Sequence, residues 1–60
     1  MRRNDKVRVT DTRNGSTREG YFSGSGDWGV RFRNSLTDFR GFQIDDFEWE
    51  FFDFEILEES

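Results

Sequence analysis

Residues 47–56 read FEWEFFDFEI. Aromatic side chains alternate with carboxylates over residues 47–51, and the alternation continues over residues 52–56 with its phase shifted by one residue. A period of two is typical of a β-strand, in which successive side chains point to opposite faces. Because a strand cannot change faces without a bulge, a bend or a break, we predict extended structure over residues 47–56 with an interruption at Phe51-Phe52. The competing interpretation is a helix over residues 45–57, although the apolar positions follow period 3.6 less well.

The segments before this stretch also have the pattern of short strands. Val7 and Val9 alternate with basic side chains, and Val30 and Phe32 alternate with arginines. We predict strands over residues 6–10, 18–22, 28–33 and 39–44. The Asn14-Gly15 pair indicates a turn after the first strand, and the glycine-rich residues 23–27 indicate a flexible hairpin connection after the second.

About five short strands in residues 1–60 predict a single all-β domain. We expect a small, strongly bent antiparallel sheet or a partly open barrel. This layout resembles that of SH3-like barrels, including the Tudor and KOW-type modules, in its number of strands and its length. The resemblance concerns architecture alone and transfers no binding site. The alternative is an α+β fold in which a short C-terminal helix packs on the sheet.

Size and composition restrict how this domain can be stabilised. A chain of this length buries only about 60% of the surface that its unfolded form exposes. It has neither cysteine nor histidine, so disulfides and the usual structural zinc sites are excluded, and we predict no cofactor. It does have eight Phe, two Trp and one Tyr. Aromatic side chains bury on the order of 150–250 Å² each, so a few of them can fill a small core.

Charge is divided unequally along the chain. Residues 1–40 carry nine basic and five acidic side chains, whereas residues 41–60 carry eight acidic side chains and no basic one. In one interpretation, strands from the two parts pair and neutralise each other. In the other, an acidic face stays exposed and attracts a basic partner.

The acidic and aromatic residues of the last third form the leading candidate site. We predict a protein-binding module that engages a basic partner protein. Its acidic face comprises Asp45, Asp46, Glu48, Glu50, Asp53 and Glu55, and its aromatic contacts are Trp49, Phe51, Phe52 and Phe54. Same-face residues of a strand lie about 6.6–6.8 Å apart, so such a row would resemble the phosphates of a nucleic-acid strand. An inhibitor that mimics nucleic acid is the specific form of this hypothesis. A row of carboxylates on an edge strand can also serve only to deter aggregation.

Two other functions are compatible with the sequence. Trp28, Arg31 and Arg33 could form a small RNA- or DNA-binding face, with the indole stacking on bases and the arginines contacting phosphates. The sequence pI near 4.6 makes nucleic acid the less favoured partner. Alternatively, the aromatic strip could be buried in a homo-oligomer, with the protein as a structural subunit.

Catalysis, metal binding and membrane insertion have little support in the sequence. Without histidine or cysteine, and with Lys6 as the single lysine, the usual nucleophile and base pairs are absent, so we predict that the protein is not an enzyme. The carboxylates do not have the spacing of a calcium-binding EF-hand loop. No apolar stretch approaches the roughly 20 residues of a membrane span, and the charged start does not resemble a signal peptide. We therefore expect a cytoplasmic protein with no membrane partner.

Overall fold

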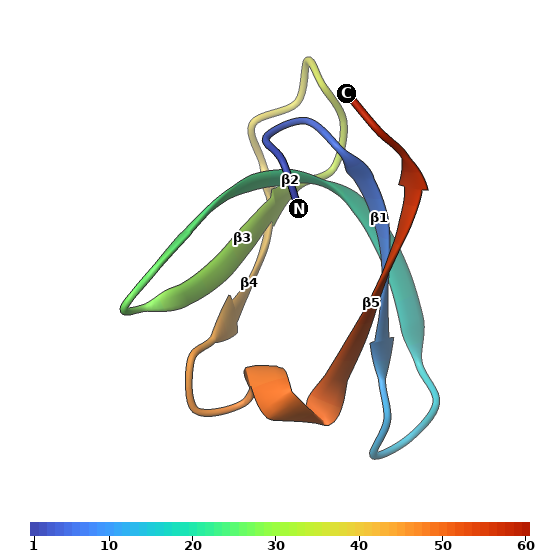
Figure 1. Cartoon of the computed structure of the whole chain (residues 1–60), viewed down its shortest axis with the longest axis vertical. Coiled ribbons are helices and arrows are strands. Elements are labelled where there is room, and N and C mark those ends of the chain that lie inside the picture. The colour runs from blue at the N-terminus through green and yellow to red at the C-terminus, as the bar shows by residue number, and fades with distance from the viewer.

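The computed structural model describes residues 1–60 as one strongly bent β-sheet (Figure 1). Its strands are β1 (Lys6–Asp11), β2 (Thr17–Gly26), β3 (Gly29–Arg33), β4 (Gly41–Asp45) and β5 (Phe52–Glu58). Their order in the sheet is β4-β3-β2-β1-β5, and every pair of neighbours is antiparallel. The two edge strands, β4 and β5, are not hydrogen-bonded to each other, so the sheet does not close into a barrel. The predicted all-β fold with a bent, partly open sheet is confirmed, and no helix here is long and apolar enough to cross a membrane.

β2 is the strand that bends the sheet. Its residues 17–21 pair with β1, and its residues 21–26 pair with β3, so one strand belongs to both halves. The register shifts between Phe22 and Gly24, and such a bulge increases the local twist. Figure 1 shows β2 arching across the molecule from the side of β1 to the side of β3. The predicted end of this strand at Phe22 was too early, because residues 23–26 continue it and only Asp27 and Trp28 form the turn.

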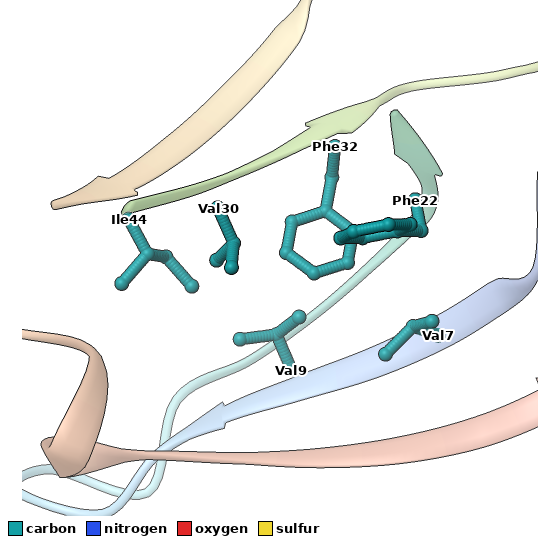
Figure 2. Packing of buried hydrophobic residues seen from close by; sticks show 6 residues of the cluster. All are labelled: Val7, Val9, Phe22, Val30, Phe32 and Ile44. Carbon is teal, nitrogen blue, oxygen red and sulfur yellow. The ribbon is translucent and has the colours of Figure 1, made fainter. Parts of the chain in front are cut away.

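The concave side of the sheet contains the core. Its buried side chains come from four strands and point toward one another (Figure 2): Val7, Val9, Phe22, Val30, Phe32 and Ile44. Phe32 lies at the centre, with its ring centroid 5.1 Å from that of Phe42 and 6.0 Å from that of Phe54. Phe22 meets the same ring edge-on at 5.9 Å. Aromatic side chains of β2, β4 and β5 therefore pack around the Phe32 ring of β3.

The segment between β4 and β5 differs from the prediction. Residues 46–48 form a turn and Trp49–Phe51 form the 3-10 helix η1, so the strand predicted over residues 47–51 is wrong. Consecutive backbone bonds tighten this segment: the Glu48 N–H donates to the Asp45 carbonyl at 3.0 Å, and the Phe51 N–H donates to the Glu48 carbonyl at 2.9 Å. The chain must pass here from one edge of the sheet to the other, which a straight strand would not accomplish. The predicted interruption at Phe51-Phe52 is confirmed, since β5 begins at Phe52, and the alternative of a continuous helix is not adopted.

Asp5 links the two ends of the chain. Its side chain is only 2% exposed and accepts hydrogen bonds from the Arg2 N–H and the Ser60 N–H, both at 2.8 Å. The Ser60 hydroxyl donates in turn to the Arg3 carbonyl at 2.8 Å. The Ser60 and Arg2 amides favour the ionised carboxylate, so they hold the pKa of Asp5 below its ordinary value of 3.8. No local pattern indicates the contact with Ser60, because the two residues lie 55 positions apart in the chain.

We expect the Asp5 contact to make folding stability dependent on pH in the acid range. The pKa of Asp5 is lower in the folded state than in the unfolded state, so its stabilisation is present above pH 3.8 and is lost as the pH falls through the folded pKa. Asp11 and Asp38 have lowered pKa values as well and contribute with the same sign. Thermal unfolding between pH 5 and pH 2, compared for the parent and Asp5→Asn, should show a shallower pH dependence in the variant. Equal slopes would show that Asp5 does not stabilise the fold through its charge.

Candidate protein-binding site

The connection between β4 and β5 presents an acidic and aromatic surface, which we call the acidic turn (residues 45–51). Phe47 is 70% exposed and Trp49 is 50% exposed, and Asp46, Glu48 and Glu50 lie between and beside them in the chain. Single exposed apolar side chains are common, but exposed apolar residues gathered in one place and rimmed by polar ones mark interaction sites. The acidic turn is therefore the part of the predicted site that is most accessible to a partner.

Backbone contacts at both ends hold the acidic turn in place. At its start, the Asp46 N–H donates to the Trp28 carbonyl at 3.2 Å, which ties it to the β2–β3 hairpin. At its end, the Phe51 carbonyl accepts hydrogen bonds from the Thr12 N–H at 2.9 Å and from the Thr12 hydroxyl at 2.6 Å. Two hairpins of the sheet thus fix the position of the turn, so its side chains are presented on a defined backbone.

The four predicted aromatic contacts separate into surface and core residues. Phe52 and Phe54 are partly buried and pack against the core from β5. Trp49 and Phe51 lie on η1 at the surface, where the Trp49 ring centroid is 6.1 Å from that of Phe54. Phe47 is the most exposed aromatic residue of the turn, yet the predicted contact set omitted it. The alternation that placed Phe47 with Trp49 and Phe51 was the signal that could have included it.

The predicted carboxylates also occupy two different surfaces. Asp53 and Glu55 lie on the outer face of β5, opposite Thr10 and Arg8, while the other four belong to the acidic turn. Because residues 46–50 form a turn and a 3-10 helix, the regular row expected for Asp46, Glu48 and Glu50 is not formed, and this part of the prediction is corrected. A single continuous acidic strip is therefore absent.

Ion pairs neutralise only part of this charge. Glu55 lies 3.7 Å from Arg8, which also reaches Glu19 at 3.6 Å. The remaining predicted carboxylates form no ion pair within the chain: Asp45, Asp46, Glu48, Glu50 and Asp53. Charge is therefore paired on the outer face of β1, β2 and β5, whereas the carboxylates of the acidic turn form no ion pair.

Arg13 lies beside the acidic turn but is bound to another carboxylate. Its Nε and one terminal nitrogen each donate to Asp11 at 3.0 Å, and its guanidinium lies 5.0 Å from the centroid of the Phe51 ring. The hydrogen bonds from Arg13 hold the pKa of Asp11 below its ordinary value, and the same contact raises the pKa of Arg13. This pairing covers one side of Phe51 and leaves Phe47 and Trp49 open.

The residues of the alternative nucleic-acid site share the convex face of the sheet. Arg31 and Arg33 alternate with buried residues of β3, and neither forms an ion pair. The Arg33 guanidinium lies 5.0 Å from the centroid of the Phe39 ring, which is 79% exposed. The Trp28 indole lies against Gly26, where an added Cβ would be 2.7 Å from its Nε1. Register places Gly26 on the same face as Arg31, so the Trp28 indole covers Gly26 on the side of the sheet that bears the two arginines.

A hollow of about 460 Å³ lies between the β2–β3 hairpin and the acidic turn. Asp27 and Asp46 line it together with Trp49 and buried core residues. The sequence singled out Asp46 and Trp49 but not Asp27, since a contact across the sheet leaves no local pattern. No group of three or more carboxylates converges as metal ligands would. No family model, curated protein or solved structure matches this chain.

Proposed function

We propose that this protein is a non-catalytic protein-binding module that docks its acidic turn on the basic surface of a partner protein. The observation that carries this proposal is the exposure of Phe47 and Trp49 beside carboxylates that have no ion pair within the chain. Buried aromatic anchors inside a polar rim are the usual arrangement of a protein-binding surface. The turn supplies both parts within seven residues.

The two kinds of side chain have different roles in this proposal. Unpaired carboxylates attract a basic surface and accelerate encounter, and this effect is screened beyond about 8 Å at physiological ionic strength. Phe47 and Trp49 supply apolar area whose removal from water slows dissociation. Mimicry of nucleic acid is not part of the proposal, because its support was a regularly spaced row of carboxylates that residues 46–50 do not form.

The test is a charge reversal on the acidic turn. A partner is first captured on the immobilised protein from a lysate of the native host and identified, and its association rate is then measured against parent and variant. Reversing Glu48 and Glu50 to Lys should lower the association rate about tenfold at low salt, because long-range attraction becomes repulsion. The difference should shrink as salt is added.

The matched control reverses Asp53 and Glu58, two exposed carboxylates of β5. Each double reversal adds four charges and so changes the net charge from −4 to 0. If location matters, the control should retain most of the parent's association rate. Equal slowing by both variants would indicate a net-charge effect, and an unchanged rate after Glu48 and Glu50 reversal would refute docking through the acidic turn.

A nucleic-acid-binding function is the second candidate, because Trp28, Arg31 and Arg33 share one face and the two arginines have no ion pair. This function predicts that the same charge reversals would have the opposite effect on binding. A single-stranded oligonucleotide would bind the Glu48 and Glu50 reversal more tightly than the parent, and changing Arg31 and Arg33 to Ala would remove its binding.

A further inference from the structure

The hollow between the β2–β3 hairpin and the acidic turn combines an apolar floor with a charged rim. Phe22 and Val30 are buried core residues that form part of its floor, and the half-exposed indole of Trp49 forms a wall. Asp27 on the hairpin and Asp46 on the turn both line it, and the Asp46 N–H donates to the carbonyl of Trp28, the residue after Asp27. Figure 1 shows these two segments toward the same end of the sheet.

The charge in this hollow is unpaired. Neither Asp27 nor Asp46 forms an ion pair, and neither side chain accepts a hydrogen bond from the chain. No lysine or arginine lines the hollow, and Met1, which does line it, forms no ion pair through its terminal amino group. Both aspartates are exposed, so a neutral ligand would gain nothing from their charge, and an anion would be repelled. The complementary occupant is a cation that also carries apolar surface.

We propose that this hollow receives an arginine side chain of the basic partner. A guanidinium is planar, so it can lie against the Trp49 indole while its edge donates to carboxylates such as Asp27 and Asp46. Its aliphatic stem would cover the apolar floor. A lysine ammonium is compact and more strongly hydrated, and it has no plane to stack on an indole. That the arginine belongs to a partner protein rests on the proposed function. Whether the hollow binds a guanidinium can be tested separately with a small probe.

The probe is N-acetyl-arginine amide, titrated at low salt into the full chain labelled with ¹⁵N. The Trp49 indole N–H resonance should shift to saturation, and the Trp28 indole, which does not line the hollow, should shift less. N-acetyl-citrulline amide has nearly the same shape without the charge and should not saturate the site. Nα-acetyl-lysine amide, which keeps its side-chain ammonium, should bind more weakly than the arginine probe.

Single carboxylate variants locate the binding. Asp46→Asn should weaken the arginine probe about tenfold, because a charge-assisted hydrogen bond is lost. Asp27→Asn should weaken binding of the probe to a similar extent, and it provides the test if Asp46→Asn fails to fold. Asp53→Asn is the matched control, since it makes the same chemical change on the outer face of β5 and should leave binding unchanged. Equal binding of citrulline, or equal weakening by Asp53→Asn, would overturn the assignment.

This result is separable from that of the proposed function. Glu48 and Glu50 do not line the hollow, so their reversal tests docking of the whole acidic turn. A captured partner that depends on Glu48 and Glu50, together with an arginine probe that ignores Asp27 and Asp46, would overturn only the arginine site. A probe that binds as expected, together with a partner that ignores Glu48 and Glu50, would overturn only the docking surface.

Discussion

Phe32→Ala should remove most or all of the folding stability of this protein. The Phe32 side chain is 1% exposed, and its ring contacts aromatic rings on β2, β4 and β5. Truncating a buried phenylalanine to alanine typically costs about 3–5 kcal/mol, because apolar contacts are lost and a cavity remains. A domain below roughly 70–80 residues rarely obtains more than about 3–5 kcal/mol from its core. The cost is thus as large as the stability available.

The measurement is urea unfolding followed by tryptophan fluorescence and circular dichroism. Phe39→Ala is the matched control, because Phe39 is 79% exposed and the chemical change is the same. Surface substitutions usually change stability by less than about 0.5 kcal/mol, so the control should unfold close to the parent. If Phe32→Ala retained the unfolding midpoint of Phe39→Ala, the core would not be organised around this ring.

Local alternation was sufficient to predict most of the strands. Val7 and Val9 are buried on β1, and Val30 and Phe32 are buried on β3, as their spacing indicated. Period two works here because each strand has one face on the core and one in solvent. The same reasoning placed Arg31 and Arg33 together on the opposite face of β3. These features depend on neighbours within one strand, which the sequence shows directly.

Alternation failed over residues 47–51 for a topological reason. Residues 46–51 connect β4 to β5, which lie at opposite edges of the sheet, so the chain has to turn here and cannot continue as a straight strand. The chain instead satisfies its backbone by local turn bonds, such as the one from the Phe51 N–H to the Glu48 carbonyl. The side chains of Phe47 and Trp49 then remain at the surface. The alternation of aromatic and acidic residues over residues 47–51 therefore does not reflect a strand with one buried and one exposed face.

Long-range contacts account for what the sequence did not predict about the site. Asp27 and Asp46 come to one hollow from the hairpin after β2 and the turn after β4, and their spacing in sequence carries no pattern. Asp5 meets Ser60 across the whole chain. The residue types of the acidic turn were predictable, since charge and aromatic content are compositional. Which of them are exposed depended on how the sheet bends.

Gly29→Ala should prevent folding, whereas Gly15→Ala should only weaken it. Both glycines have positive φ, +123° for Gly29 and +77° for Gly15, so an alanine is strained at either position. A left-handed residue other than glycine costs roughly 1–2 kcal/mol, and nothing lies within 4 Å of a Cβ added at Gly15. At Gly29 the added Cβ would overlap the Ile44 carbonyl oxygen and would lie 2.9 Å from the Asp45 Cα.

These clashing atoms belong to the backbone of β4, so no side-chain rotation can relieve them. Alanine at Gly29 must therefore push β4 away from β3, which would break the pairing that positions the acidic turn. Circular dichroism and ¹H–¹⁵N spectra of the two variants should show a collapsed amide dispersion for Gly29→Ala and a native-like one for Gly15→Ala. Because φ at Gly29 lies farther from the allowed left-handed region than φ at Gly15, the difference between the variants reports both this added strain and the contact between β3 and β4. A native-like spectrum for Gly29→Ala would mean that β4 does not pack this closely on β3, and the hollow between the hairpin and the acidic turn would then lack its supporting strand.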